Sequence, residues 1–254
     1  EKFVGNFGTY YETVGQYNLT GSFGLHQEGH SMSFSGGRNF FDGWSPAIAD
    51  TSRFQQWKPK EQLFGHLQYA YLINKFKIHL SSSFFQDDIL NRGHRLMPYY
   101  ETAFDDYYAT KRLSNALHLS DEIGEHKNII LTLAHNHYRR TKNTYIKDLV
   151  TLEENLTNNP EDQDTTKFNS FLARGVYNVT HPERKLHYEL GYDVNVETGS
   201  GGRMKLGRQE ISDYALFASA EYKPTGDLTI RPGLRVSYNT TDVAPIVPSI
   251  NFRY

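Results

Sequence analysis

The sequence predicts an all-β fold, namely a transmembrane antiparallel up-and-down β-barrel with about twelve strands in this chain. Two patterns support this class: apolar and polar residues alternate over stretches of about ten residues, and short and long connections alternate along the chain. The aromatic content also supports it, with 18 Tyr and 16 Phe among 254 residues. A tilted strand of about 9–11 residues is long enough to cross a bilayer.

The alternation is clearest toward the C-terminal end. In residues 228–239 every even position is apolar and every odd position is polar or Gly, and residues 186–197 repeat this pattern. Because successive side chains of a strand point to opposite sides, each stretch has one apolar and one polar face. The same pattern predicts strands at residues 3–12, 16–27, 30–41, 63–73, 76–85, 107–120, 128–140, 168–179, 186–197, 211–222, 228–239 and 246–254.

The connections between these strands form two classes. Short ones fall near 28, 74, 121–127, 180–184 and 223–227, and long ones near 42–60, 86–106, 141–166, 198–209 and 240–245. Outer-membrane barrels place short turns on the periplasmic side and long loops outside. A soluble β-sandwich, which remains an alternative as a binding module, has no reason to place all its long loops at one end.

Composition excludes several other classes. The 27 basic and 29 acidic residues leave a net charge of −2, which argues against nucleic-acid binding. The absence of Cys excludes disulfides and thiolate metal sites, and we predict no cofactor. The sequence contains no run of about 18 apolar residues, so it predicts no membrane-spanning helix. No signal peptide begins at Glu1, so we expect a mature form or an internal segment.

Four stretches carry a family resemblance: residues 21–44, residues 91–113, HYRRTKNTYIKDL at 137–149 and LTIRPGLRVSYN at 228–239. They resemble the barrel domain of TonB-dependent outer-membrane receptors, most of all the Bacteroidetes-type branch. The resemblance implies that residues 1–254 are a segment of a larger 22-stranded barrel, and the plug domain of the family is absent from them. It implies location in the outer membrane of a Gram-negative bacterium, in contact with lipid.

The same resemblance implies a function. Such receptors take up a scarce nutrient, such as a ferric siderophore, haem, a cobalamin or a glycan, with energy from the TonB complex acting through the plug. One alternative is a self-contained smaller barrel that acts as a passive channel or adhesin. An outer-membrane enzyme is the other, but no GxSxG elbow is present and we expect no catalytic site.

Candidate ligand-binding residues lie in or beside the long loops. Aromatic side chains there are suited to stacking on an apolar or sugar-like ligand, although girdle aromatics at a membrane interface give the same signal. Arginines at the lumen or rim are suited to an anionic ligand such as a ferric chelate, although cross-strand pairing with acids is the alternative. The predicted ligand-binding residues are Trp44, Trp57, Arg95, Tyr99, Tyr100, Arg139 and Arg140.

Two metal-site patterns are weaker. His135 and His137 share a strand face, and His26 and His30 flank a turn, but neither pair has a third ligand at usable spacing. The acidic run at 161–164 lacks the glycine spacing of a calcium loop. We therefore predict no metal site and interpret these residues as polar side chains of the lumen and loops.

Overall fold

The structure, a computed structural model, describes residues 2–46, 53–202, 204–243 and 245–254, and these residues form one antiparallel sheet. Twelve strands follow one another in the order β1-β2-β3-β4-β5-β6-β7-β9-β10-β11-β12-β13, and the short β8 pairs with β7 alone. The strands are β1 Phe3–Glu12, β2 Gln16–Gln27, β3 His30–Phe41, β4 Lys60–Ile73, β5 Phe76–Arg95, β6 Thr102–Ile123, β7 Lys127–Asp148, β8 Glu154–Leu156, β9 Asp164–Val179, β10 Leu186–Ser200, β11 Arg208–Tyr222, β12 Thr229–Asn239 and β13 Val247–Arg253. The predicted up-and-down sheet is confirmed.

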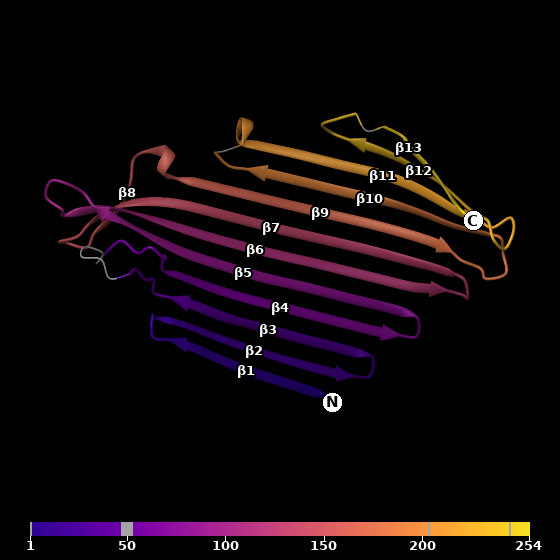
Figure 1. The fold of residues 1–254 in the computed structure, drawn as a ribbon, viewed down its shortest axis with the longest axis horizontal. Coiled ribbons are helices and arrows are strands. Elements are labelled where there is room, and N and C mark those ends of the chain that lie inside the picture. Colours follow the sequence, from indigo (N-terminus) through magenta and orange to yellow (C-terminus); the bar gives the residue numbers. More distant parts are fainter. Residues whose placement is uncertain (1, 47–52, 203, 244) are drawn as a thin grey trace.

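Two short 3-10 helices interrupt the connections, η1 at Pro160–Asp162 and η2 at Lys205–Gly207. No helix in the described part of the chain is long and apolar enough to cross a membrane. The strands lie side by side (Figure 1). Short turns lie at the right end of this view, and the left end carries the long connections together with the tight turn between β1 and β2. We call these the short-turn end and the long-loop end.

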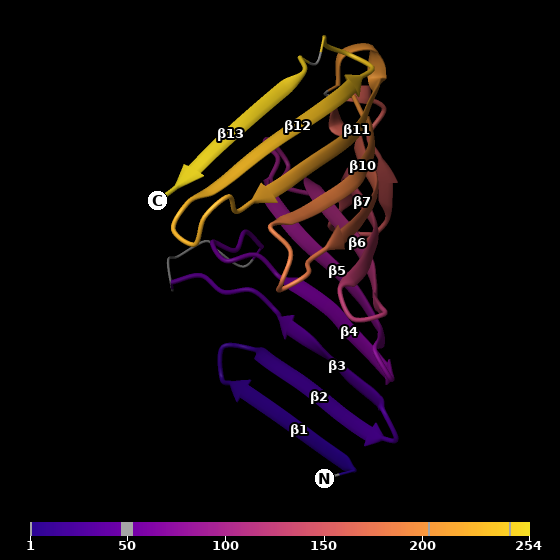
Figure 2. The same ribbon diagram turned by 90° about the vertical axis from the view of Figure 1, so that its right-hand side faces the viewer.

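The sheet curls into an open arc with β1 and β13 at its two extremes (Figure 2). Each of these two strands pairs with a single neighbour, β1 with β2 and β13 with β12. Every pair along the arc is antiparallel and joins sequential strands, apart from the small detour around β8. The local order of the chain therefore sets the order of the sheet.

The two faces of the sheet differ in chemistry. We call one the apolar face, which carries the even residues of β10 to β12, and the other the polar face, which carries the odd ones. Phe7 and Leu216 project from the apolar face with 77% and 69% of their surface exposed. A face this apolar and this exposed needs an apolar environment. In membrane barrels the lipid-facing side has this composition and the polar side lines the lumen.

Three strands, β5, β6 and β7, are much longer than the sequence predicts, whereas β4, β9, β10 and β11 extend by only a few residues. Loops predicted at 86–106 and 141–166 are in large part strand, because β5 continues to Arg95, β6 starts at Thr102 and β7 continues to Asp148. With 20, 22 and 22 residues, these strands exceed the roughly 9–11 that a bilayer crossing needs. Their outer parts project beyond the other strands at the long-loop end (Figure 1). The prediction failed there because both faces of a projecting ribbon meet polar surroundings, so the alternation that marks a strand disappears.

A buried charged pair secures the base of this projection. Asp105 is only 1% exposed, and one of its carboxylate oxygens accepts hydrogen bonds from the Arg53 guanidinium and from the Gly93 backbone N–H, the latter at 3.3 Å. Arg53 belongs to the connection between β3 and β4, and Gly93 lies where the β5–β6 register shifts. The pair therefore ties the long connection to the projecting strands.

Candidate ligand-binding surface

A groove of about 360 Å³ opens on the polar face, between the long-loop halves of β6, β7, β9, β10 and β11. The sheet register builds it, because Arg112 is the cross-strand partner of Tyr138, and Tyr138 is the partner of Phe168. Its lining includes Arg112, Tyr138, Phe168, Glu197, Met204 and Gln209. These side chains come from five strands and one loop.

Met204 reaches the groove because Gly199 has no side chain. A Cβ atom placed on Gly199 would lie 2.5 Å from the Met204 methyl carbon and 3.1 Å from the Phe168 ring. The loop between β10 and β11 thus folds a thioether onto the β10 backbone beside an aromatic ring. A thioether is polarizable and adapts to irregular apolar shapes, so this end of the groove suits an apolar part of a ligand.

Two arginines of the polar face, Arg112 and Arg140, lie over aromatic rings. The guanidinium carbon of Arg112 is 5.6 Å from the centre of the Tyr138 ring, and that of Arg140 is 5.2 Å from the centre of the Tyr108 ring. Such stacking holds the guanidinium plane while its N–H groups remain available to an anion. On the far wall, Glu197 accepts a hydrogen bond from the Asn195 amide at 3.0 Å. The groove thus offers the Arg112 guanidinium, an acid, aromatic rings and a thioether, and Arg140 lies on the same face two residues along β7 from Tyr138.

Above the groove a hydrogen-bonded cluster stiffens the polar face. The Asp106 carboxylate accepts hydrogen bonds from the Thr144 hydroxyl at 2.6 Å and the Asn91 amide at 3.1 Å, and Lys142 lies 3.6 Å away. The Gln163 side chain in turn accepts from the Thr144 backbone N–H at 3.3 Å and donates to the Thr157 hydroxyl at 2.9 Å. The polar run at 161–164 therefore anchors the loop after β7.

The predicted tryptophans lie together. Trp44 and Trp57 form an isolated antiparallel bridge with two backbone hydrogen bonds of 2.9 Å, and their rings lie 4.9 Å apart. They remain 41% and 49% exposed, so ring surface is available to a ligand. They lie outside the groove residues, in the connection between β3 and β4.

The predicted tyrosines and arginines are spread over the long-loop end. Tyr99 and Tyr100 lie in the turn between β5 and β6, and Tyr99 is 80% exposed. Arg95 ends β5 opposite Ala103. Arg140 projects from the polar face, whereas the neighbouring Arg139 projects from the apolar face. The structure therefore brings together only part of the predicted set.

The groove residues Tyr138, Phe168, Glu197 and Met204 are absent from the set predicted from sequence. One available signal was the position of these residues along their strands. Tyr138 and Phe168 are aromatic, yet the alternation assigns their positions to the polar face. Aromatic rings on a polar face away from the membrane interface are suited to binding. Met204 gives no such signal, because its position depends on the conformation of a loop.

A tyrosine–glutamate–lysine chain lies on the other face of the projection. The Tyr107 hydroxyl donates to both carboxylate oxygens of Glu154 at 3.1 Å, and Lys147 donates to the same carboxylate at 2.5 Å. Burial, and then the Glu154 carboxylate, raise the pKa of Tyr107 to about 12. The Lys147 hydrogen bond holds the pKa of Glu154 below its ordinary value.

We expect the Tyr107 phenol to lose its proton at a higher pH than an ordinary tyrosine. Because folding raises the Tyr107 pKa from 10.0 to about 12, the folded state favours the neutral phenol. This stabilisation is complete below about pH 10 and is lost as the pH rises from there through about 12. In a tyrosinate absorbance titration, Tyr107→Phe should remove one late-titrating group, and Glu154→Gln should move that group to lower pH. Identical curves for Glu154→Gln and the unmodified protein would contradict the assignment.

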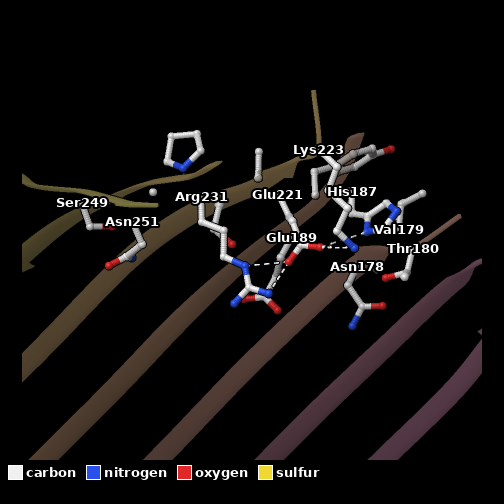
Figure 3. A pocket seen from close by; sticks show the side chains of 15 residues that line it. Asn178, Val179, Thr180, His187, Glu189, Glu221, Lys223, Arg231, Ser249 and Asn251 are labelled. Carbon is white, nitrogen blue, oxygen red and sulfur yellow. Dashed lines mark hydrogen bonds and ion pairs between the residues drawn. The ribbon is translucent and has the colours of Figure 1, made fainter. Parts of the chain in front are cut away.

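A second pocket, of about 600 Å³, lies on the polar face at the short-turn end (Figure 3). Glu221 is its centre, with Arg231 Nε at 2.6 Å, Lys223 at 2.9 Å and His187 at 3.7 Å. Further along the same face, Asp193 pairs with Arg235 at 2.6 Å and Arg174 at 3.5 Å. Cross-strand pairing with acids is therefore confirmed for these three arginines.

Comparisons with known proteins identify the fold. No family model and no curated protein matches the sequence. Among solved structures, the chain is similar to a ferric enterobactin receptor variant from Pseudomonas aeruginosa (TM-score 0.59, 14% identity, 98% of this chain and 40% of that one). It is also similar to the siderophore receptor PirA from Acinetobacter baumannii (TM-score 0.57, 13% identity, 98% of this chain and 40% of that one). A third similar structure is the outer membrane transporter YddB from Escherichia coli (TM-score 0.58, 9% identity, 93% of this chain and 36% of that one).

These similarities extend over nearly all of this chain, but the chain spans only about two fifths of the length of the structures it matches. At such low identity the agreement concerns the fold. The sheet has the antiparallel up-and-down architecture of outer-membrane β-barrels.

Proposed function

We propose that residues 1–254 are a β-barrel segment of a TonB-dependent receptor that imports a scarce nutrient across the outer membrane of a Gram-negative bacterium. One observation carries the proposal: a sheet with the fold of outer-membrane receptors holds a groove on its polar face, near the long-loop end, in which an arginine lies over an aromatic ring. Lipid around the apolar face and a ligand on the polar face explain why the two faces of the sheet differ in chemistry. The sequence resemblance supports the Bacteroidetes-type branch.

The proposed mechanism divides the work between this chain and the rest of the receptor. The loops and the polar face capture the ligand, and a plug outside these residues rearranges when the TonB complex acts on it. Further strands beside β1 and β13 would complete a barrel of the 22-stranded type. The acid–base pairs around Glu221 and Asp193 then lie on the lumen wall below the groove.

The groove favours an anionic ligand with flat or apolar parts. Arg112 and Arg140 supply charge, and Tyr138, Phe168 and Met204 supply apolar contact. A ferric chelate fits this chemistry better than a neutral glycan, while haem and a cobalamin remain candidates. Trp44, Trp57, Arg95, Tyr99 and Tyr100 are proposed as outer contacts, with Arg140 on the groove side. Arg139 projects from the apolar face and is not proposed as a contact of the nutrient.

Growth on a nutrient panel tests this function. A deletion strain should lose growth on one iron source, corrinoid or glycan, and the full-length gene should restore it. Arg112→Gln with Tyr138→Leu in the full-length protein should raise the nutrient concentration for half-maximal growth by about tenfold or more, since each lost contact contributes roughly a kcal/mol. Lys77→Gln, at the short-turn end of β5, is the matched control.

Energy dependence separates the proposal from a self-contained barrel that acts as a passive channel or adhesin. Uptake should stop when the proton gradient is collapsed or TonB is deleted. Uptake that continues at the same rate would reject TonB coupling and favour the passive channel.

A further inference from the structure

Three positively charged side chains adjoin one another on the apolar face. Lys111 of β6 is the direct cross-strand partner of Arg139 of β7, which is the direct partner of Lys167 of β9. All three are exposed. Side chains at such positions have Cβ atoms about 4.5–5.5 Å apart, and like charges there repel each other. We call these residues the basic row. It carries a repulsion that a bound anion would relieve.

No acid in the described part of the chain relieves this repulsion. Within the described ranges, none of the three forms an ion pair, and the same-face acids on the flanking strands have other partners. Asp88 of β5 accepts a hydrogen bond from Gln86 at 2.7 Å, and Glu210 of β11 pairs with Arg208 at 3.1 Å. The polar face behaves differently, since Asp193 and Glu221 each bind two or more basic side chains there.

The position of the row along the strands points to a membrane boundary. One step toward the short-turn end, the same face carries Phe84 paired with Leu113. Two pairs further on, a continuous row of leucines crosses β5, β6 and β7, formed by Leu80, Leu117 and Leu133. The basic row therefore lies directly above the apolar band, where lipid headgroups adjoin a membrane barrel.

A polar notch descends from the basic row into the apolar band. His137 and Asn169 are hydrogen-bonded side chain to side chain at 2.6 Å, directly below Arg139 and Lys167. One row further down, Ser82 donates to the Asn115 side chain at 2.7 Å, and His135 is the cross-strand partner of Asn115. Polar groups facing hydrocarbon are costly. A polar headgroup seated in the notch would remove this cost.

We propose that the basic row and the notch bind a lipid headgroup that carries phosphate, in the outer leaflet of the membrane. Lysine and arginine bind phosphate through charge-assisted hydrogen bonds, and cations next to an anionic leaflet are attracted to it. A lipid is favoured over a free anion because the row adjoins the apolar band and lies on the face away from the groove. The inference rests on the outer-membrane location under the proposed function.

Binding of bisphosphorylated lipid A to the full-length protein in detergent, followed by native mass spectrometry, tests the inference. Lys111→Gln with Arg139→Gln should weaken binding by about tenfold or more, because each cation near an anionic lipid contributes roughly 1 kcal/mol. The matched control is Arg112→Gln with Arg140→Gln, which removes the same charge from the same strands on the opposite face. The control should bind the lipid as the unmodified protein does.

Three further measurements complete the test. Dephosphorylated lipid A should bind weakly to all variants, and inorganic phosphate should compete poorly. Lys111→Arg with Arg139→Lys, which keeps both charges, should retain binding even if the neutral variant assembles poorly. Equal loss in the two neutral double variants, or full competition by inorganic phosphate, would overturn the proposal. Because no nutrient is present, that outcome would leave the uptake function untouched.

Discussion

Replacement of Asp105 by Asn should destabilise the long-loop end of the sheet by about 3–5 kcal/mol, because breaking a buried ion pair leaves the partner charge without compensation. Asp105 is 1% exposed and the Arg53 side chain is 14% exposed, so little water is available to solvate the orphaned guanidinium. The Gly93 N–H would also lose its charged acceptor. We expect the connection before β4 to detach, which trypsin cleavage after Arg53 or Lys58 would report.

Two controls isolate the pair. Asp227→Asn removes a carboxylate from an exposed turn between β11 and β12 and should change stability by less than about 0.5 kcal/mol. Arg53→Gln combined with Asp105→Asn should cost less than the sum of the two single changes, because the double variant leaves no charge unpaired. Additive costs, or protection from trypsin in Asp105→Asn, would show that the pair does not hold this connection.

Replacement of Gly37 by Ala should impair assembly of the sheet near β2, β3 and β4. A Cβ atom there would lie 2.3 Å from the Leu19 carbonyl oxygen and 2.9 Å from the Phe64 ring. The ring has room to rotate, but the carbonyl belongs to the β2–β3 ladder and moves only with its strand. Overpacking of this kind costs about 1–3 kcal/mol. Urea unfolding and the fraction of heat-modifiable, folded protein in a gel measure the effect.

Gly24→Ala is the matched control, because Gly24 lies on the same face of the adjacent strand. Its added Cβ would lie 3.9 Å from the Met32 carbonyl oxygen, an ordinary contact. Alanine also lowers the entropy of the unfolded chain, so this variant should be neutral or slightly more stable. Equal stability of the two variants would mean that the backbones around Gly37 separate without cost.

The sequence predicts the membrane-spanning part of the fold well. Alternation in β10, β11 and β12 gave the strands and the faces of their side chains, because one face must be apolar and the other polar. The alternation of short and long connections gave the up-and-down order. The same reasoning missed the projecting halves of β5, β6 and β7, where both faces of a ribbon are polar and hydrogen bonding alone continues the strand.

The candidate site was predictable only in its chemistry. Aromatic and arginine residues near the long loops suggested ligand binding, and the structure keeps Trp44 beside Trp57 and stacks Arg140 on Tyr108. Their grouping depends on register, which a single sequence does not specify for neighbouring polar strands. Arg139 and Arg140 are adjacent in sequence, but the pleat places them on opposite faces, one in the basic row and one toward the groove.

By itself, the sequence determined the fold class, the strand order and the two faces of the sheet, because each depends on local periodicity and on short connections between neighbouring strands. Only the tertiary structure decided the Arg53–Asp105 pair, the groove beside Met204 and the alignment of Lys111, Arg139 and Lys167. The physical reason is that these features join residues from strands and loops far apart in the chain. Their distances follow from the register of each ladder and from the folding of a loop, which local residue patterns do not encode.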